Sequence, residues 1–447
     1  MTDDPRELIE RSPMTKWQIS AITLCILLVS LDGFDVLSIS FAAPGIAKEW
    51  GMDRAALGIV LSMELIGMGI GAFILGHLAD RIGRRPIILF SLVTMAAGMY
   101  LASIAPSVTI LSAIRLFTGL GIGGILASVN AMAAEFSNQR SRDLSVSLMA
   151  AGYPLGVIIG GTIASLLLAS FDWRSVFLFG AVLTLIFLPL AWLLMPESIS
   201  YLMHRRPSGA LRRINHTLGR MGHPPIETLP PASDEVPHAN LARLFRPDLL
   251  RVTLLLSIAY FAHIMTFYYI IKWIPKLVVD MGFSPALSGS VLVWANVGGI
   301  CGSVLLGLLS RRYSVRKLVI GTLLAAAVMV AIFGTGQSTL PQLSLVAGIA
   351  GFFTNAAIVG MYALCAQCFP TEVRAGGTGF VIGAGRGGAV LGPVVAGFLF
   401  ESGQGGLLMV SAIMAVGSLI AAMALFMLPS RAQVSRSDSV SQQARPG

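Results

Sequence analysis

Long apolar blocks alternate with short polar segments along almost the whole chain. Each block is long enough for an α-helix of about 20 residues, the length that crosses a bilayer. The blocks predict twelve membrane spans, at 17–41, 56–79, 86–106, 109–134, 143–167, 174–195, 251–272, 286–309, 316–335, 342–367, 376–400 and 406–428. They are far longer than the roughly 10-residue alternating strands of an outer-membrane barrel. The pattern therefore predicts an all-α integral membrane protein with twelve transmembrane helices.

The composition favours a membrane protein over a soluble enzyme. Of the 447 residues, 55% are hydrophobic and 12% are charged, and the mean hydropathy is +0.79. An average soluble domain has roughly 25% charged residues. The lower share found here leaves too little polar surface for a water-soluble protein of several domains.

The net charge of +9 would suggest a nucleic-acid partner if the protein were soluble. The positions of the charges argue otherwise. With a cytoplasmic N-terminus, 24 of the 31 Lys and Arg residues fall in the termini and in the loops on the same side. This positive-inside bias predicts that both termini are cytoplasmic. We therefore expect no nucleic-acid partner and a location in the plasma membrane, which is the inner membrane of a bacterium.

The longest polar stretch divides the chain into two halves of six spans. Its many Pro and Arg residues predict a connector with one amphipathic helix near 207–221, rather than a folded domain. The predicted parts are a cytoplasmic segment at 1–16, an N-terminal six-helix bundle at 17–195, the connector at 196–250, a C-terminal six-helix bundle at 251–428 and a disordered cytoplasmic tail at 429–447.

The two halves repeat each other at an offset of about 231 residues. The basic run Gly76–Arg85 after the second span is echoed by Gly307–Lys317 after the eighth, and the Gly-rich fifth span corresponds to the Gly-rich eleventh. Two six-helix repeats joined by a loop are typical of alternating-access transporters, which bind substrate where the repeats meet.

The run Gly-His-Leu-Ala-Asp-Arg-Ile-Gly-Arg-Arg at 76–85 resembles the signature between helices 2 and 3 of the major facilitator superfamily. The resemblance implies a cytoplasmic charge network that holds the outward-facing state. Its expected members are Gly76, Asp80, Arg81, Gly83, Arg84 and Arg85, together with Glu135 and Arg140 at the end of the fourth span. A basic cluster that only sets topology is the alternative, but it would need neither Asp80 nor Gly83.

A second motif narrows the family. Leu31-Asp32-Gly33-Phe34-Asp35 in the first span resembles the D-G-x-D motif of the aromatic acid:proton symporters, which include benzoate and hydroxybenzoate transporters. Further segments that resemble this family are 115–123, 196–198, 273–277 and 385–388, and the likeness covers about 17–428. It implies a monomeric carrier that takes up a small aromatic carboxylate with protons.

Ionisable side chains within a span cost at least ~2.5 kcal/mol each on insertion scales, so each needs a role. Asp32 and Asp35 share a helix face, and two carboxylates in a low dielectric cannot both ionise easily. One of them is therefore expected to take up the coupled proton. The helical rise places Arg115 at the depth of Asp35, where it can pair with an ionised aspartate and be released by a protonated one. A fixed structural ion pair is the alternative.

Arg386 lies near the middle of the eleventh span and is expected to hold the substrate carboxylate, because a guanidinium offers two parallel hydrogen bonds. Bonding to backbone carbonyls of that Gly-rich helix is the alternative. For Glu64 in the second span, a functional role and snorkelling to the interface are equally compatible with the sequence.

Polar and aromatic residues on other spans are expected to complete the substrate pocket with Asp35. They are Tyr153, His263, Trp294, Asn296 and Asn355, with Tyr268, Tyr269 and Tyr362 as further aromatic candidates. Aromatic walls suit an aromatic ring, and amides or phenols can bind ring hydroxyls. Plain helix packing is the alternative for each aromatic residue. His263 either relays protons or is held by a backbone carbonyl.

No cofactor, metal site or enzymatic centre is expected. Cys365 and Cys368 form a C-x-x-C without a second ligand pair, and the chain has no phosphate-binding loop. Two other carriers of the same fold stay open, one for an aliphatic acid such as shikimate or a dicarboxylate, and a drug/proton antiporter. A membrane enzyme or sensor would need a catalytic constellation or a folded cytoplasmic domain, and neither is visible.

Overall fold

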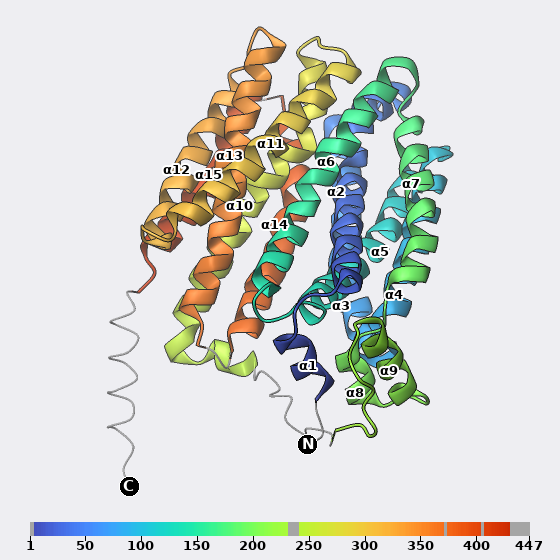
Figure 1. Ribbon diagram of the computed structural model, residues 1–447. Helices are drawn as coiled ribbons and strands as arrows, with labels where there is room; N and C mark the ends of the chain where they lie inside the picture. The colour runs from blue at the N-terminus through green and yellow to red at the C-terminus, as the bar shows by residue number, and fades with distance from the viewer. Residues whose placement is uncertain (1–3, 231–240, 371–372, 404–405, 430–447) are drawn as a thin grey trace. The chain divides into compact units, whose positions relative to one another are not determined.

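The computed structural model describes residues 4–230, 241–370, 373–403 and 406–429, and over these residues all regular structure is helical (Figure 1). Twelve of the described helices are long and apolar enough to cross a membrane. They are α2 (Lys16–Trp50), α3 (Arg54–Ile82), α4 (Arg84–Ser103), α5 (Val108–Glu135), α6 (Arg142–Ser170), α7 (Arg174–Leu194), α10 (Pro247–Asp280), α11 (Pro285–Leu309), α12 (Val315–Gly334), α13 (Leu340–Cys368), α14 (Arg374–Glu401) and α15 (Leu407–Phe426). The predicted all-α class with twelve spans is confirmed.

Several helices extend beyond the spans predicted from hydropathy, because a helix continues through polar residues that no longer count as apolar. α2 begins at a capping box, in which Thr15 and Gln18 exchange hydrogen bonds, and it ends at Gly51 in the left-handed conformation. α10 continues through Pro275 to Asp280, so the segment expected after the seventh span is part of this helix.

The helices form two compact units, which are described separately. Unit 1 comprises Met1–Gly51 and Met63–Val236, and unit 2 comprises Met52–Ser62 and Pro237–Gly447. The two units differ from the predicted six-helix bundles at one segment: Met52–Ser62, which includes the first turns of α3, belongs to unit 2. Within unit 2, Arg54 pairs with Asp280 at 3.1 Å. The domain boundaries drawn from the sequence remain predictions.

Small residues bring helix backbones into contact in unit 1, where α2 packs on α6 and α4 packs on both α5 and α7. A Cβ atom on Gly156 of α6 would lie 1.7 Å from the carbonyl oxygen of Ser30 on α2. Likewise, a Cβ atom on Gly119 of α5 would lie 2.1 Å from the carbonyl oxygen of Glu64 on α3. These close contacts set the positions of the polar residues on the same helices.

Unit 2 repeats this arrangement. α10 packs on α14 as α2 packs on α6, and α12 packs on α15 as α4 packs on α7. α11 packs on α13. The two Gly-rich helices α6 and α14 thus pack on the first long helix of their unit. A Cβ atom on Gly351 of α13 would lie 1.9 Å from the carbonyl oxygen of Ala295 on α11.

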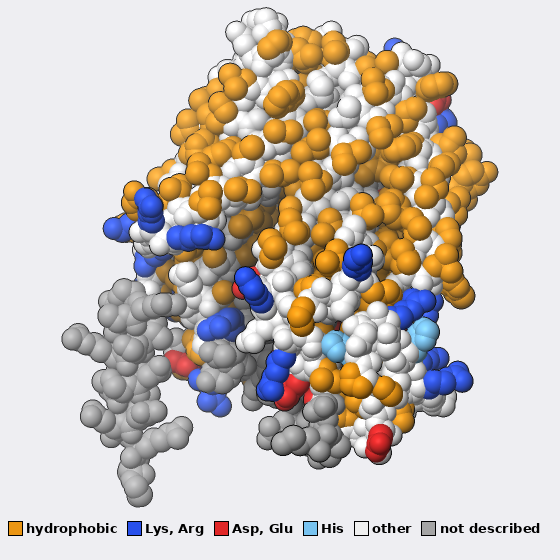
Figure 2. Space-filling view, in the orientation of Figure 1, with side chains coloured by type: hydrophobic (Ala, Val, Ile, Leu, Met, Phe, Trp, Pro, Cys, Tyr) orange, Lys and Arg blue, Asp and Glu red, His pale blue; other side chains and the backbone are white. Residues whose placement is uncertain are grey.

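Three short helices lie at the end of unit 1 where α3 and α5 end (Figure 1): α1 (Pro5–Arg11), α8 (Ile199–Arg205) and α9 (Ala210–Arg220). α9 is the amphipathic helix expected near 207–221, whereas α8 was not predicted. Lys and Arg side chains gather near these helices in Figure 2. The connector also contains a short 3-10 helix, η1 (Leu241–Phe245). Nearly all of the predicted tail lies outside the described residues.

Candidate functional site

Three charged side chains of unit 1 meet in a buried cluster. Arg115 on α5 pairs with Asp35 on α2, with 3.1 Å between Nη2 and Oδ1, and the same Nη2 donates to Glu64 Oε1 on α3. The exposed fraction of each residue is 1% or less. Because unpaired charges are very costly in such surroundings, the three side chains depend on one another.

The Arg115 guanidinium has further contacts with α2, α4 and α7. Nη2 also donates to the backbone oxygen of Asp35 at 3.0 Å, and Nη1 lies 3.3 Å from Met99 Sδ on α4. The ring of Phe177 on α7 lies 5.4 Å from the guanidinium carbon. Arg115 therefore links α2, α3 and α5, and it packs against α4 and α7.

The D-G-x-D motif on α2 adds a third buried carboxylate to this region, Asp32. Asp32 lies one turn before Asp35 and has an exposed fraction of 0%. Between them, Gly33 lies against the backbone of Tyr153 on α6, where a Cβ atom would be 2.1 Å from the carbonyl oxygen. Only glycine permits this approach, so the motif combines two acids with a close contact between helices.

Glu64 is the member of this cluster to which the sequence assigned no definite role. Snorkelling to the interface is wrong, because the residue is fully buried against Arg115. A signal was available: Glu64 is about ten residues into α3 and Arg115 about seven into α5, so the helical rise puts both at similar depth.

The run at 76–85 forms a second polar network at the junction of α3 and α4. Gly83 precedes α4 with φ +109°, and Oε1 of Glu197 accepts the backbone N–H of Arg84 at 2.8 Å and of Arg85 at 3.2 Å. A Cβ atom on Gly83 would lie 2.4 Å from Glu197 Oε2. Glu197 thus caps the N-terminus of α4, where a carboxylate is favoured.

Glu135 at the end of α5 connects this junction to α8. It pairs with Arg84 at 2.8 Å and accepts hydrogen bonds from Ser198 Oγ at 2.7 Å and Ser200 N at 2.6 Å. Burial raises the pKa of the neighbouring Glu197 carboxyl above its usual value. The segment Pro-Glu-Ser at 196–198 was identified in the sequence only by its resemblance to the family. Its Glu197 and Ser198 belong to the same hydrogen-bond network as the 76–85 run.

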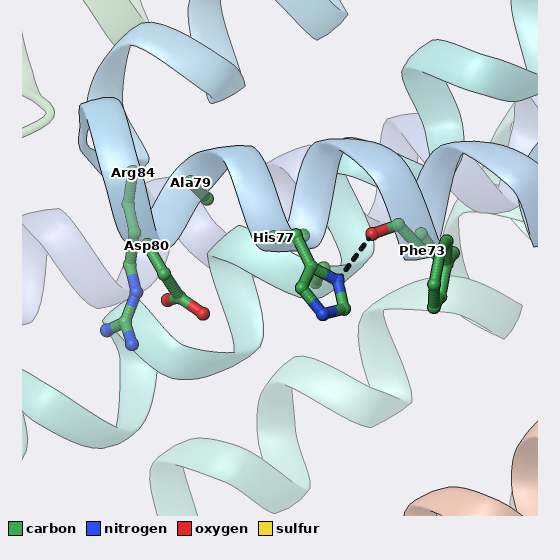
Figure 3. Close-up of a pocket in the computed structure, with 8 residues that line it drawn as sticks. Phe73, His77, Ala79, Asp80 and Arg84 are labelled. Carbon is green, nitrogen blue, oxygen red and sulfur yellow. Dashed lines mark hydrogen bonds between the residues drawn. The ribbon is translucent and has the colours of Figure 1, made fainter.

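A cavity of about 340 Å³ lies beside the end of α3 in unit 1. Gly76, His77, Asp80 and Arg84 are among the residues that line it. In Figure 3 Asp80 and Arg84 lie side by side, while the His77 ring is held by a 2.8 Å hydrogen bond to the carbonyl oxygen of Phe73.

The other arginines expected in this network differ in their contacts and exposure. Arg85 Nη2 donates to the carbonyl oxygen of Trp192 at 2.5 Å. Arg81 and Arg140 are exposed, and Arg142 rather than Arg140 binds α1, through Glu10 at 2.7 Å. The gating role of all these residues remains a prediction.

In unit 2, Arg386 on α14 is half-buried near a pair of tyrosines. The hydroxyls of Tyr260 on α10 and Tyr362 on α13 are 2.9 Å apart, and the Arg386 charge lies within electrostatic reach of Tyr260. A Cβ atom on Gly385 would lie 2.2 Å from the Tyr260 ring, so this glycine lets α14 rest on the tyrosine. The sequence did not point to Tyr260, because nothing local distinguishes it from a packing residue.

Asn296 and Asn355 line one small cavity within unit 2, with Phe267 among its apolar walls. Asn296 Nδ2 donates to the carbonyl oxygen of Leu292 at 2.9 Å. Trp294 is 54% exposed and does not line this cavity. The two amides are thus brought together as expected, and their contact with substrate stays a prediction.

His263 on α10 is fully buried with both ring nitrogens engaged. Nε2 lies 2.9 Å from the carbonyl oxygen of Thr354, and Nδ1 lies 2.9 Å from Ser418 Oγ. Because a carbonyl only accepts, Nε2 donates and Nδ1 accepts. This geometry favours a structural histidine over a proton relay. Tyr269, whose hydroxyl lies 2.7 Å from Ser411 Oγ, is buried in the same way.

Comparison with known proteins agrees with the twelve helices and the repeated units. Residues 25–293 and 256–446 match the Major Facilitator Superfamily. The chain belongs to the major facilitator superfamily. The structure is similar to that of a D-xylose-proton symporter, with a TM-score of 0.72 and 18% identity over 93% of this chain and 98% of that chain. This likeness shows the shared fold.

Two relatives of similar sequence are transporters of aromatic acids. The gallate transporter of Pseudomonas putida is 31% identical over 90% of this chain and 90% of its own length. The 4-hydroxybenzoate transporter PcaK of Acinetobacter baylyi is 29% identical over 95% of this chain and 93% of its own length. The resemblance to aromatic acid transporters inferred from the first span is thereby confirmed, and these relatives are transporters rather than enzymes.

Proposed function

We propose that this protein is a proton-coupled importer of a small aromatic carboxylate that works by alternating access. The observation that carries the proposal is the fully buried Asp35–Arg115–Glu64 cluster in a chain related to aromatic acid transporters. A buried group that exchanges a proton is what such a carrier needs. The proposed location is the bacterial inner membrane, with both termini cytoplasmic.

Proton coupling is proposed to act through the charge on Arg115. When Asp35 is ionised, its carboxylate and backbone oxygen both hold the guanidinium, and α2 is tied to α5. A proton on Asp35 removes the ionic part of this contact and loosens the link. Asp32 one turn away belongs to the same charge balance. The exposed fraction of Asp35 is only 1%, which supports a coupling role rather than direct contact with substrate.

Substrate recognition is proposed for unit 2. Arg386 can bind a carboxylate through two hydrogen bonds, and the adjacent Tyr260 and Tyr362 hydroxyls can complete a polar site. Asn296 and Asn355 offer amides for ring hydroxyls beside an apolar wall. The network of Glu135, Glu197 and the 76–85 run is proposed to act as the cytoplasmic gate.

Uptake by cells that express the protein tests the proposal. The substrates are labelled gallate, 4-hydroxybenzoate, protocatechuate, vanillate and shikimate, each with and without a protonophore. We expect accumulation of at least one aromatic acid, and we expect the protonophore to abolish it. Accumulation of shikimate alone would indicate an aliphatic-acid carrier, and reduced retention would indicate an exporter.

Arg386→Gln tests the substrate site separately. Losing the bidentate contact is expected to raise the half-saturating concentration for uptake at least tenfold, about 1.4 kcal/mol of binding energy. Arg213→Gln, which removes an exposed arginine on α9, is the control for loss of a positive charge. Unchanged affinity in Arg386→Gln would move the carboxylate site elsewhere.

A further inference from the structure

We propose that the small cavity lined by Asn296 and Asn355 in unit 2 binds a single ring hydroxyl of the substrate. The carrier would then favour hydroxylated aromatic acids over benzoate and over methoxylated acids. This inference rests on the proposed uptake of an aromatic carboxylate and names the class of acid within it. It follows from the size of the cavity, from the two amides in its wall and from the close packing of the helices around it.

The cavity has room for one small polar group but not for a ring. Its volume is about 10 Å³, close to the ~10–15 Å³ that one water molecule needs. A pocket that encloses a drug-sized ligand has roughly 300–1,000 Å³. Asn296 on α11 is only 6% exposed, whereas Phe267 on α10 and Asn355 on α13 are half-buried in the cavity wall. A ring hydroxyl can therefore enter while the ring itself stays outside.

The two amides suit a hydroxyl, which both donates and accepts hydrogen bonds. Asn296 Nδ2 donates to the carbonyl oxygen of Leu292 at 2.9 Å. Because a carbonyl only accepts, this contact fixes the orientation of the amide and turns Oδ1, an acceptor, away from that carbonyl. The Asn355 amide in the same wall carries both a donor and an acceptor. A phenol can bond to both amides, whereas a methoxy oxygen cannot donate and benzoate has no ring oxygen.

The rest of the wall has no polar side chain, which sharpens the selectivity. It is formed by Phe267, Ile270 and Ile271 on α10 and by small residues such as Ala295 and Ala347 on α11 and α13. A site that hydrogen-bonds a substrate hydroxyl discriminates strongly against the analogue that lacks it, because polar groups of the site are then left without that partner. The two amides among apolar side chains therefore favour the hydroxylated acid.

Close backbone contacts keep this cavity from widening. A Cβ atom on Gly298 of α11 would lie 1.9 Å from a backbone oxygen of α13, and one on Gly302 would lie 2.1 Å from another. These two glycines flank Gly299, where a Cβ atom would lie 2.8 Å from Asn355 Nδ2. α11 and α13 therefore meet without side chains between their backbones at successive turns. Because such packing yields little, the methyl group of a methoxy substituent finds no room.

Competition for uptake tests the inference in cells that express the full-length protein. Uptake of a labelled aromatic acid that wild type accumulates is measured against unlabelled benzoate, 3-hydroxybenzoate, 4-hydroxybenzoate and 4-methoxybenzoate. In wild type, at least one hydroxybenzoate is expected to halve uptake at a concentration at least tenfold below that of benzoate and of the methoxy acid. Asn355→Leu keeps the approximate volume of the side chain but removes its hydrogen bonds. It is expected to lower this preference at least fivefold and to change inhibition by benzoate less than twofold.

Gly299→Ala tests the size of the cavity, because the added methyl group pushes on the Asn355 amide. It is expected to lower the preference for hydroxybenzoate in the same way. Gly307→Ala on the same helix is the matched control, since its Cβ atom would meet nothing within 4 Å, and it should keep the wild-type preference. Equal inhibition by benzoate and both hydroxybenzoates in wild type, or an unchanged preference in Asn355→Leu, would overturn the inference. Absence of uptake of any aromatic acid by wild type would instead contradict the proposed function.

Discussion

At the scale of single residues, the absence of a side chain at Gly83 permits the contact between the α3–α4 junction and Glu197. Its φ of +109° is open almost only to glycine, and a Cβ atom would displace the Glu197 carboxylate that caps α4. The positive φ and the lack of room for a Cβ atom therefore both require glycine at this position.

Gly83→Ala is therefore expected to destabilise the protein by about 1–3 kcal/mol from backbone strain, with a further loss from the displaced cap. Thermal unfolding of the protein in detergent measures the effect. Gly76→Ala in the same run is the control, because its Cβ atom would lie at an ordinary 3.5 Å from Ala127 Cβ. Equal melting temperatures for the two variants would contradict the prediction.

The raised pKa of Glu197 makes a prediction about pH. Its pKa in the folded protein lies above the ordinary 4.5, because burial disfavours the charged form. The stabilisation from this group is therefore complete below about pH 4.5 and is lost as the pH rises through the higher, folded-state pKa. The melting temperature of wild type minus that of Glu197→Gln should be larger at pH 5 than at pH 8.

Gly76→Ala serves here as a reference substitution without a titrating group, so its difference from wild type should not change in the same way. If the melting temperature of wild type minus that of Glu197→Gln were larger at pH 8 than at pH 5, the pKa of Glu197 would be lowered by folding, and the prediction would be wrong.

At the scale of elements, contact between helix backbones decides where polar groups meet. α2 and α6 approach so closely at Ser30 and Gly156 that no side chain fits between them. α2 also carries Asp32 and Asp35, and a shift of α2 would move Asp35 away from Arg115. The Gly-rich spans are thus structural first, and they position the charged cluster as a consequence.

Gly156→Ala is expected to cost about 1–3 kcal/mol through overpacking and to lower uptake, because α2 must move away from α6. Gly69→Ala on α3 is the control, since its Cβ atom would meet nothing within 4 Å. The control should be neutral or slightly more stable, as alanine favours a helix more than glycine does. If Gly156→Ala has the stability and uptake of wild type, α2 and α6 can move apart without loss of stability or function, and the prediction is wrong.

At the scale of the whole molecule, the distribution of Lys and Arg predicts a topology that fusions can test. A fluorescent protein that folds only in the cytoplasm should be bright when fused after the C-terminus or within the connector. Alkaline phosphatase, which is active only outside, should be active when fused after Gly51 in the first loop. Phosphatase activity from the connector fusion would invert the predicted orientation.

The sequence could predict much of this fold because the relevant signals are local. Apolar blocks measure the spans, short motifs indicate the family, and self-similarity reveals the repeat. Helix ends were less predictable, because caps such as Thr15 and Gly51 extend α2 beyond its apolar block. α8 escaped prediction for a similar reason, since its seven residues depend on hydrogen bonds that its backbone N–H groups donate to Ser198 Oγ and Glu135 Oε1.

The sequence by itself determined the class of the protein, its twelve membrane spans and the depth of each charged residue along its helix. The tertiary structure alone decided which of these residues meet. Glu64 joins Arg115 and Asp35, Glu197 caps α4, and Tyr260 meets Tyr362. The physical reason is that helical rise gives depth, whereas the partner of a side chain depends on how helices far apart in sequence rotate and pack.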